Sequence, residues 1–237
     1  MANKTNAYIL SKKESGESDL VVTFYSNTFG KIDLFVKSAR KSKKRFQGKL
    51  ENSNQYSIEF VKAKKINSLN SLTSIEQAKN IRFYEFDKSI YIYRSIILEM
   101  IDKFEIDNQP NSEVFSLMDF FYLNINSNNE IKKIKTTVKT INKYLKINGV
   151  QPTIKKCYSC KKDLINIKFF DLKNGGSVCN KCKLKNKPFI LNLNKPINTK
   201  TLNRDFNYLN NLLIILLKFC EYHSGKIFNS VKYLRVI

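Results

Sequence analysis

Apolar residues occupy every second position through the first third of the chain. The alternation runs from Thr5 to about Ile75 in four or five short segments, among them 20–25 and 31–36. A period of two is typical of strands that bury one face. Between these two segments, Asn27–Gly30 favours a hairpin, because Gly30 can adopt a positive φ. The strands predict a small closed barrel, since closure removes exposed strand edges.

After Ile81 the apolar period changes to that of a helix. Residues 82–104 carry one continuous apolar stripe, and residues 111–125 predict a second helix capped by Asn111 or Ser112. In a third helix, 129–149, the apolar residues share one face, six lysines lie elsewhere, and Gly149 is placed to end the helix. A last apolar helix is expected over 199–223. The fold class predicted is therefore α+β, with a barrel domain over 1–78 and a helical domain over 79–237.

Two Cys-x-x-Cys pairs interrupt the helical region. Cys157 and Cys160 form the first pair, Cys179 and Cys182 form the second, and 18 residues separate the pairs. This spacing predicts a zinc site in which four thiolates form a closed tetrahedral shell. The segments IKFF and KNGGSV predict a hairpin between the pairs that turns at residues 174–175, as in a zinc ribbon. We expect one structural zinc ion in a module over 157–182, because a full sulfur shell leaves no position for water or substrate.

A pair of disulfides or a redox dithiol would use the same four cysteines. The N-terminus lacks the apolar region of a signal peptide, so we expect a cytoplasmic protein, in which disulfides are disfavoured. A redox dithiol would not need the second matched pair. The fifth cysteine, Cys220, lies in the last apolar helix and is expected to be buried in the core.

The charge balance indicates a polyanionic partner. The chain has 42 Lys and Arg against 20 Asp and Glu, a formal net charge of +22. Its richness in Lys, Asn and Ile matches an AT-rich coding sequence, but that bias also favours Glu codons and does not explain the sign. Nucleic acid is the leading partner, and a basic protein of the membrane surface is a distant second. The longest apolar run, 212–217, is far too short to span a bilayer, so no membrane partner is expected.

A dense run of positive charge lies in residues 37–51, directly after the third strand. Seven cations lie there: Lys37, Arg40, Lys41, Lys43, Lys44, Arg45 and Lys49. Such a run is either a solvated flexible loop or a clamp for phosphates. Tyr25 and Phe35 support a clamp because they fall on the outward register of neighbouring strands, where bases could stack, although packing beneath the helical region would explain both rings equally well. Phe46, inside the run, is expected to anchor it to the barrel.

The motifs of common enzymes are missing from the sequence. No phosphate-binding Gly-x-x-x-x-Gly-Lys-Ser/Thr loop is present, and the one histidine, His223, offers neither a metal pair nor an obvious general base. A binding protein is therefore expected rather than an enzyme. Two alternatives stay open: a zinc-ribbon RNA-binding protein of translation or ribosome assembly, and a metal-dependent nuclease, which would need clustered carboxylates that the sequence does not show.

Three segments together resemble the bacterial RecO recombination-mediator family. GESDLVVTFYSNTFGKIDLFVKSARKSKKRFQGKLE, residues 16–51, resembles the N-terminal signature of the family. KYLKINGVQPTIKKCYSC, residues 143–160, resembles its helix, Gly-x-x-Pro and first knuckle, and EYHSGKIFNSVKYL, residues 221–234, resembles its C-terminal segment. The order of the three is more specific than any one of them, and residues 52–130 add little.

The resemblance implies a five-stranded oligonucleotide-binding (OB) barrel followed by a helical domain that carries the cysteine module. Family members bind single- and double-stranded DNA, anneal complementary strands, join the ring-forming RecR protein and help load RecA onto DNA coated by single-strand-binding protein. They also engage the acidic C-terminal tail of that protein through a pocket in the helical domain, whose residues have no motif match here. Such a protein would be cytoplasmic and associated with the nucleoid. Not every member keeps the four cysteines, so the zinc prediction depends on their spacing.

Overall fold

The computed structural model describes residues 2–42, 45–46, 50, 54–65, 68–78, 87–183, 190–198 and 206–236. The chain forms two compact units, one from residues 1–85 and 94–116, the other from residues 86–93 and 117–237. Helix α1 (Lys88–Phe104) and helix α2 (Ser112–Ile125) each contribute residues to both units. Residues 82–86 of the first predicted helix lie outside the described residues.

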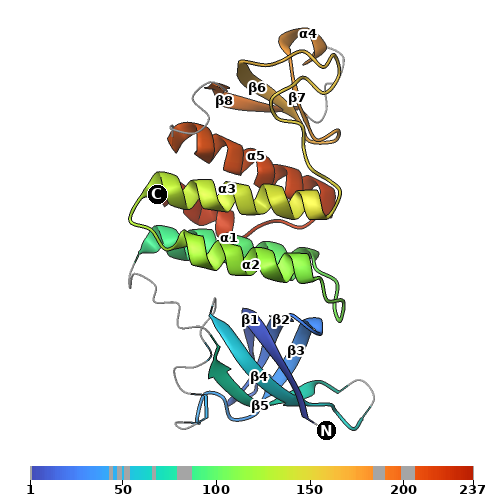
Figure 1. Ribbon diagram of the computed structural model, residues 1–237, viewed down its shortest axis with the longest axis vertical. Helices are drawn as coiled ribbons and strands as arrows, with labels where there is room; N and C mark the ends of the chain where they lie inside the picture. The colour runs from blue at the N-terminus through green and yellow to red at the C-terminus, as the bar shows by residue number, and fades with distance from the viewer. Residues whose placement is uncertain are drawn as a thin grey trace. The chain divides into compact units, whose positions relative to one another are not determined.

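Five strands close into a barrel in the first unit (Figure 1). They are β1 (Ala2–Ser15), β2 (Asp19–Ser26), β3 (Gly30–Val36), β4 (Gln55–Val61) and β5 (Asn70–Gln77). Their order around the barrel is β1-β2-β3-β5-β4, and β4 pairs with β1 to close it. β3 and β5 run parallel, whereas the other neighbours are antiparallel. The prediction of a five-stranded OB-like barrel is confirmed.

Alternate residues of the strands fill the barrel, as the period-two pattern predicts. The inward side chains of β2 and β3 are buried: Val22, Phe24, Ile32, Leu34 and Val36. The connection after β3 adds Ala39, Phe46 and Leu50 to the same core. The predicted role of Phe46 as an anchor is therefore confirmed.

The hairpin between β2 and β3 requires glycine at its end. Gly30 has a φ of +67°, and a Cβ atom there would lie 2.3 Å from the carbonyl oxygen of Gln109. The segment after α1 approaches so closely because the backbone N–H of Asn108 donates to the carbonyl of Lys31 (2.8 Å). The ring of Phe115 on α2 also lies 5.5 Å from that of Tyr8. Residues 94–116 thus complete the barrel unit.

The helices begin and end at the residues that their caps dictate. Asn111, rather than Ser112, caps α2, since its Oδ1 accepts from the N–H groups of Glu113 (3.0 Å) and Val114 (3.2 Å). In the second unit, α3 (Glu130–Ile147) packs beside α5 (Phe206–Ser224) (Figure 1). Gly149 follows α3 with a φ of +72°, as predicted for a helix stop. Residues 199–205 of the last predicted helix lie outside the described residues.

One lysine of α3 departs from the predicted pattern. The lysines were expected away from the buried face, but Lys133 is 2% exposed. Its Nζ donates to Asp87 Oδ2 and to Ser89 Oγ, both at 2.6 Å, and also pairs with Glu130. Helical periodicity could not show this, because Asp87 lies 46 residues earlier in the chain.

A small three-stranded sheet carries the cysteine module. Strands β6 (Asn166–Asp171) and β7 (Gly176–Val178) form the predicted hairpin, and β8 (Ile190–Asn198) pairs with the other edge of β6. Short helix α4 (Asn180–Lys183) follows β7, and a 3-10 helix, η2 (Ser230–Val236), follows α5. Cys220 on α5 is 1% exposed, which confirms its predicted place in the core. Within the described residues, no helix is both long enough and apolar enough to cross a membrane.

Candidate metal centre and nucleic-acid interface

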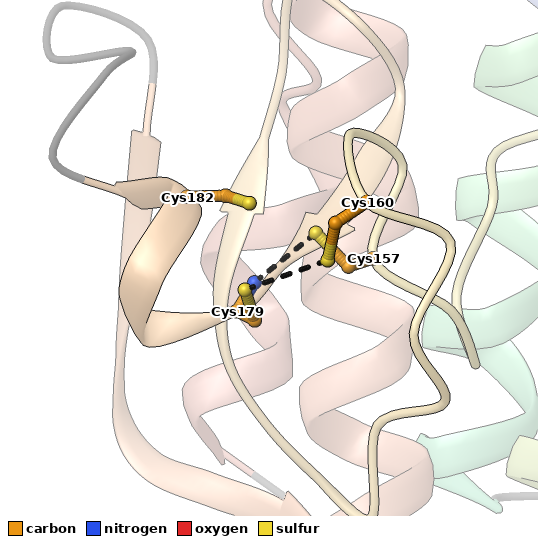
Figure 2. A group of neighbouring side chains, drawn as sticks. All are labelled: Cys157, Cys160, Cys179 and Cys182. Atoms are coloured by element: carbon orange, nitrogen blue, oxygen red, sulfur yellow. Dashed lines mark hydrogen bonds between the residues drawn. The ribbon is translucent and has the colours of Figure 1, made fainter.

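The four paired cysteines converge on one point, and their sulfurs face one another in Figure 2. Every Sγ of Cys157, Cys160, Cys179 and Cys182 lies within 4.8 Å of the other three, and the Cys160 and Cys179 sulfurs are 3.8 Å apart. Four thiolates at about 2.3 Å from a tetrahedral ion would be separated by about 3.8 Å. The cluster could therefore bind one metal ion with little rearrangement.

Local backbone bonds build the two knuckles. In the first, the N–H of Cys157 donates to the carbonyl of Lys162 (2.8 Å), and the N–H of Lys161 donates back to Cys157 (2.9 Å). In the second, the N–H of Cys182 donates to the carbonyl of Cys179 (3.1 Å) at the start of α4. A bond from the N–H of Tyr158 to the carbonyl of Ser177 (2.9 Å) joins the first knuckle to β7. These bonds fix the four sulfurs on one side of the module.

Backbone N–H groups also adjust the acidity of the thiols. Burial raises the pKa of Cys157, but hydrogen bonds from the backbone N–H groups of Cys160, Cys179 and Ser159 outweigh burial and bring it to about 6. The backbone N–H of Cys182 lowers the pKa of Cys179. The side-chain hydrogen bond with Cys179 raises the pKa of Cys182 to about 12. The backbone thus favours thiolate, the metal-binding form, at Cys157 and Cys179.

The basic connection after β3 starts as a turn held against the barrel. Ser38 has a φ of +55°, and its N–H donates to Asp19 Oδ1 (2.7 Å). The N–H of Arg40 donates to the carbonyl of Ser18 (2.9 Å). Together with the buried Ala39 and Phe46, these bonds show that the described part of the connection is packed on the barrel rather than freely solvated. Lys43, Lys44 and Lys49 lie outside the described residues.

Four predicted site cations of this connection are described, and all four are exposed: Lys37, Arg40, Lys41 and Arg45. Arg40 pairs with Glu14 (3.1 Å), and Lys41 pairs with Glu17 (3.9 Å). Arg45 donates to the carbonyl of Thr73 (2.9 Å). Exposed ion pairs contribute only about 0–1 kcal/mol, so a phosphate could displace these carboxylates at small cost.

The two aromatic residues predicted to stack bases differ in their exposure. Tyr25 is 0% exposed, its hydroxyl donates to Glu105 Oε2 (2.9 Å), and burial raises its pKa. Tyr25 points away from the barrel core, as predicted, but it is not available to a base, because the segment after α1 covers that face of β2 and the packing alternative holds. Phe35 is half-buried between Val21 on β2 and Ser71 on β5, so part of its side chain is accessible.

A groove that no sequence motif indicates lies between α3 and α5 in the second unit. The groove has a volume of about 280 Å³, and its walls include Val138, Lys139, Ile154, Lys155, Leu212 and Leu216. At one side lies Tyr208, which is 3% exposed and whose hydroxyl has no hydrogen-bond partner within the described part of the chain. These residues come from three separate segments, so no local motif could have found them.

The chain is similar to two models of one protein family and to several proteins that share one name. The chain matches two family models, recombination protein O N terminal over residues 1–80 and recombination protein O C terminal over residues 86–231. A DNA repair protein RecO of Syntrophus aciditrophicus is 30% identical over 185 residues, covering 76% of this chain and 69% of the relative. The protein of that name from Desulfatibacillum aliphaticivorans is 30% identical over 182 residues, covering 75% and 70%. The one from Caldicellulosiruptor bescii is 31% identical over 193 residues, covering 77% and 73%.

Proposed function

This chain belongs to the RecO family, and we propose that it is a recombination mediator that binds single- and double-stranded DNA and anneals complementary strands. With RecR, it would help load RecA onto DNA coated by single-strand-binding protein. Family membership supports the role in DNA repair and recombination, and the partners RecR and RecA follow from the family resemblance. A protein acting on chromosomal DNA would work in the cytoplasm at the nucleoid.

The observation that carries this proposal is the exposed cationic connection on a closed OB-like barrel. Arg40, Lys41 and Arg45 extend from a turn that Asp19 and the barrel core hold in place. Phe35 offers a partly accessible ring on the adjacent strand. Cations beside an aromatic surface are the usual means by which a barrel binds a single strand without reading its sequence.

Annealing then follows from electrostatics. Two DNA strands repel each other, and a surface that neutralises the phosphates of both lowers this repulsion and raises the local concentration of the complement. No nucleotide hydrolysis is needed for such a step. This agrees with the expectation of a binding protein rather than an enzyme.

We further propose that the cysteine cluster holds one structural zinc ion. Thiolates are preferred ligands of zinc, and the separation of 3.8 Å between Cys160 and Cys179 fits a tetrahedral shell. When bound, the ion would supply cross-linking of the two knuckles and no open coordination position for catalysis. The knuckle backbone and β7 would keep the thiolates oriented toward it.

ATP-free annealing of complementary single strands tests the proposed function. We expect the full chain to accelerate annealing of bare strands and of strands coated with the cognate single-strand-binding protein, and salt to suppress the acceleration. If about five phosphates are neutralised, log affinity for a single strand should fall with log salt at a slope near −3.5. Replacing Arg40, Lys41, Lys43, Lys44 and Arg45 by Ala should flatten this slope.

The matched control removes five cations from α1 and α3, by replacing Lys88, Lys132, Lys135, Lys143 and Lys146 with Ala. It makes the same change in net charge but should leave the slope much closer to that of the unaltered chain. Equal slopes for both variants would sink the role of the basic connection. Tighter binding of structured RNA than of single-stranded DNA would favour the RNA-binding alternative, and magnesium-dependent cleavage of labelled DNA would favour a nuclease.

The groove between α3 and α5 supports binding of the acidic tail of single-strand-binding protein. The flanking Lys139 and Lys155 suit an acidic peptide. The apolar walls, and the Tyr208 hydroxyl, which has no hydrogen-bond partner among the described residues, offer it further contacts. Charge reversal by Lys139→Glu and Lys155→Glu should weaken binding of the tail peptide at least tenfold by fluorescence anisotropy. The pair Lys132→Glu and Lys143→Glu on the same helix serves as the control, and equal weakening by both pairs would place the tail elsewhere.

A further inference from the structure

The cysteine module has a cationic concavity beside its four sulfurs. Its volume is about 590 Å³, within the range of roughly 300–1,000 Å³ that is usual for small-ligand sites. It could therefore admit a nucleotide but not a duplex. Besides Cys160, Cys179 and Cys182, its walls are formed by Lys162, Leu164, Asn166, Lys168, Val178, Asn180 and Lys181.

The chemistry of these walls suits a phosphate backbone. Lys162, Lys168 and Lys181 are exposed, and none of the described residues that line the concavity is acidic. This differs from the barrel connection, where Arg40 and Lys41 already pair with carboxylates of the same unit. The nearby ion pair between Lys156 and Asp163 is long (3.9 Å) and involves none of these three lysines.

The positive charge of the cysteine module exceeds what would balance the negative charge of a metal bound by four thiolates. Residues 153–183 contain eight lysines and two aspartates. Four thiolates around one divalent ion carry a net charge of about −2, which would balance only two of the six surplus lysines. The remaining positive charge must be balanced by an anionic partner or solvated by water. Three of the eight lysines line one concavity, which favours a partner there.

From these observations we infer that the concavity is a second attachment site for single-stranded DNA, distinct from the barrel connection. The three lysines would bind consecutive phosphates, and the amides of Asn166 and Asn180 could hydrogen-bond to sugar or base edges. Phe169, which lies beneath Lys168 and the neighbouring Lys183, is 4% exposed and therefore not open to a base. With no exposed ring among the described residues that line the concavity, binding here would be electrostatic and indifferent to base sequence.

This inference rests on the proposed function and adds a physical reason for it. A protein that anneals DNA binds two strands, and cationic sites on two separate units would let each strand bind at a different site. The site would also extend the length of single strand that one chain covers.

The test uses the full, metal-loaded chain and a fluorescein-labelled oligo-dT whose anisotropy is followed across a salt series. The triple variant Lys162→Gln, Lys168→Gln, Lys181→Gln should make the slope of log affinity against log salt shallower by about 2, from about 0.7 for each lost phosphate contact. The control variant Lys132→Gln, Lys143→Gln, Lys146→Gln removes the same charge from exposed positions of α3 and should leave the slope nearly unchanged. Metal release on thiol modification should stay at one ion per chain in both.

Equal slopes for the two triple variants would overturn the inference, as would an effect confined to single-stranded RNA. If the concavity variant loses its metal, the single changes Lys162→Gln and Lys181→Gln replace it, with an expected change of about 0.7 each. Equal slopes with annealing intact would leave the proposed function standing. An unaltered chain that binds no single strand would overturn both.

Discussion

Lys133 shows how one buried charge can organise a unit. It is 2% exposed and joins the start of α1 to α3 through Asp87 and Ser89. Replacement by Met removes the cation and leaves two carboxylates without their partner. Because breaking a buried pair from one side is costly, we expect Lys133→Met to lower the free energy of unfolding by about 3 kcal/mol. Urea denaturation followed by circular dichroism would measure this change.

The adjacent Lys132 provides the control for this prediction. It is exposed on the same helix, so Lys132→Met should change the free energy of unfolding by no more than about 0.5 kcal/mol. If the two variants were equally stable, the network around Lys133 would contribute nothing measurable to the fold.

The same network predicts a sensitivity to acid. Burial opposes ionisation of Asp87, but hydrogen bonds from Lys133, Ser89 and Ile90 outweigh it and lower its pKa from 3.8 to about 2. A carboxyl whose pKa is lower in the folded state stabilises the fold above its unfolded pKa, and this stabilisation is lost as the pH falls toward the folded value. The free energy of unfolding should therefore decline between about pH 4 and pH 2. Asp87→Asn should show a smaller decline over this interval, and an identical decline would assign the acid sensitivity to other groups.

Residue-scale predictions from sequence succeeded where the cause is local. Phe46 is apolar within a charged run, so its burial could be foreseen. Tyr25 could not be placed, because what covers it is Glu105 and its neighbours, some 80 residues later in the chain. The burial of Lys133 has the same origin, a partner that is distant in sequence.

At the scale of elements, two glycine turns of the barrel allow a matched comparison. Gly16 and Gly30 both have positive φ, +65° and +67°, but a Cβ at Gly16 would meet nothing within 4 Å. Gly16→Ala should therefore cost about 1 kcal/mol from backbone strain alone. Gly30→Ala adds a contact of 2.3 Å with the backbone of Gln109 and should cost at least about 2 kcal/mol more. Thermal denaturation of both variants would measure the two losses of stability. Equal losses would mean that the segment after α1 moves away from Gly30 at no cost.

The cysteine module should depend on its metal more than the barrel does. It has two short knuckles and a three-residue β7, which bury little apolar surface of their own. A strong chelator should therefore increase amide hydrogen exchange in residues 153–183 while the barrel strands keep their protection. Cys182→Ser should abolish binding of the metal, whereas Cys220→Ser, outside the cluster, should retain one ion per chain. Unchanged hydrogen exchange after metal removal would show that the knuckles stay folded without the metal.

Most elements followed from local signals, although no strand was predicted where β8 lies. Alternation predicted the barrel strands, Asn111 and Gly149 marked a helix start and a helix stop, and the two Cys-x-x-Cys pairs predicted the cluster. The groove between α3 and α5 and the concavity beside the cysteines have no such signal, because each is lined by segments that meet only in the folded chain. Spacing can predict which residues bind a metal, but it does not show which surface surrounds them.

At the scale of the whole molecule, the unit that contains the barrel is larger than the predicted barrel domain. The sequence predicts a domain over residues 1–78, yet the compact unit that contains the barrel also includes residues 94–116. Three contacts explain why these residues belong with it. They are the bond from the Tyr25 hydroxyl to Glu105, the approach of Gln109 to Gly30, and the packing of Phe115 on Tyr8.

Truncation measures the contribution of these contacts. A fragment of residues 1–78 exposes Tyr8 and Tyr25, which are both 0% exposed in the full chain, whereas a fragment of residues 1–116 keeps them covered. With a lost hydrogen bond of about 1 kcal/mol and newly exposed aromatic surface, we expect the shorter fragment to melt about 10 °C lower. Both fragments retain the basic connection, so both should bind oligo-dT with the same dependence on salt while folded. Equal melting temperatures would show that the barrel closes without the segment after α1, whereas a lower melting temperature with unchanged binding would separate what stabilises the barrel from what binds DNA.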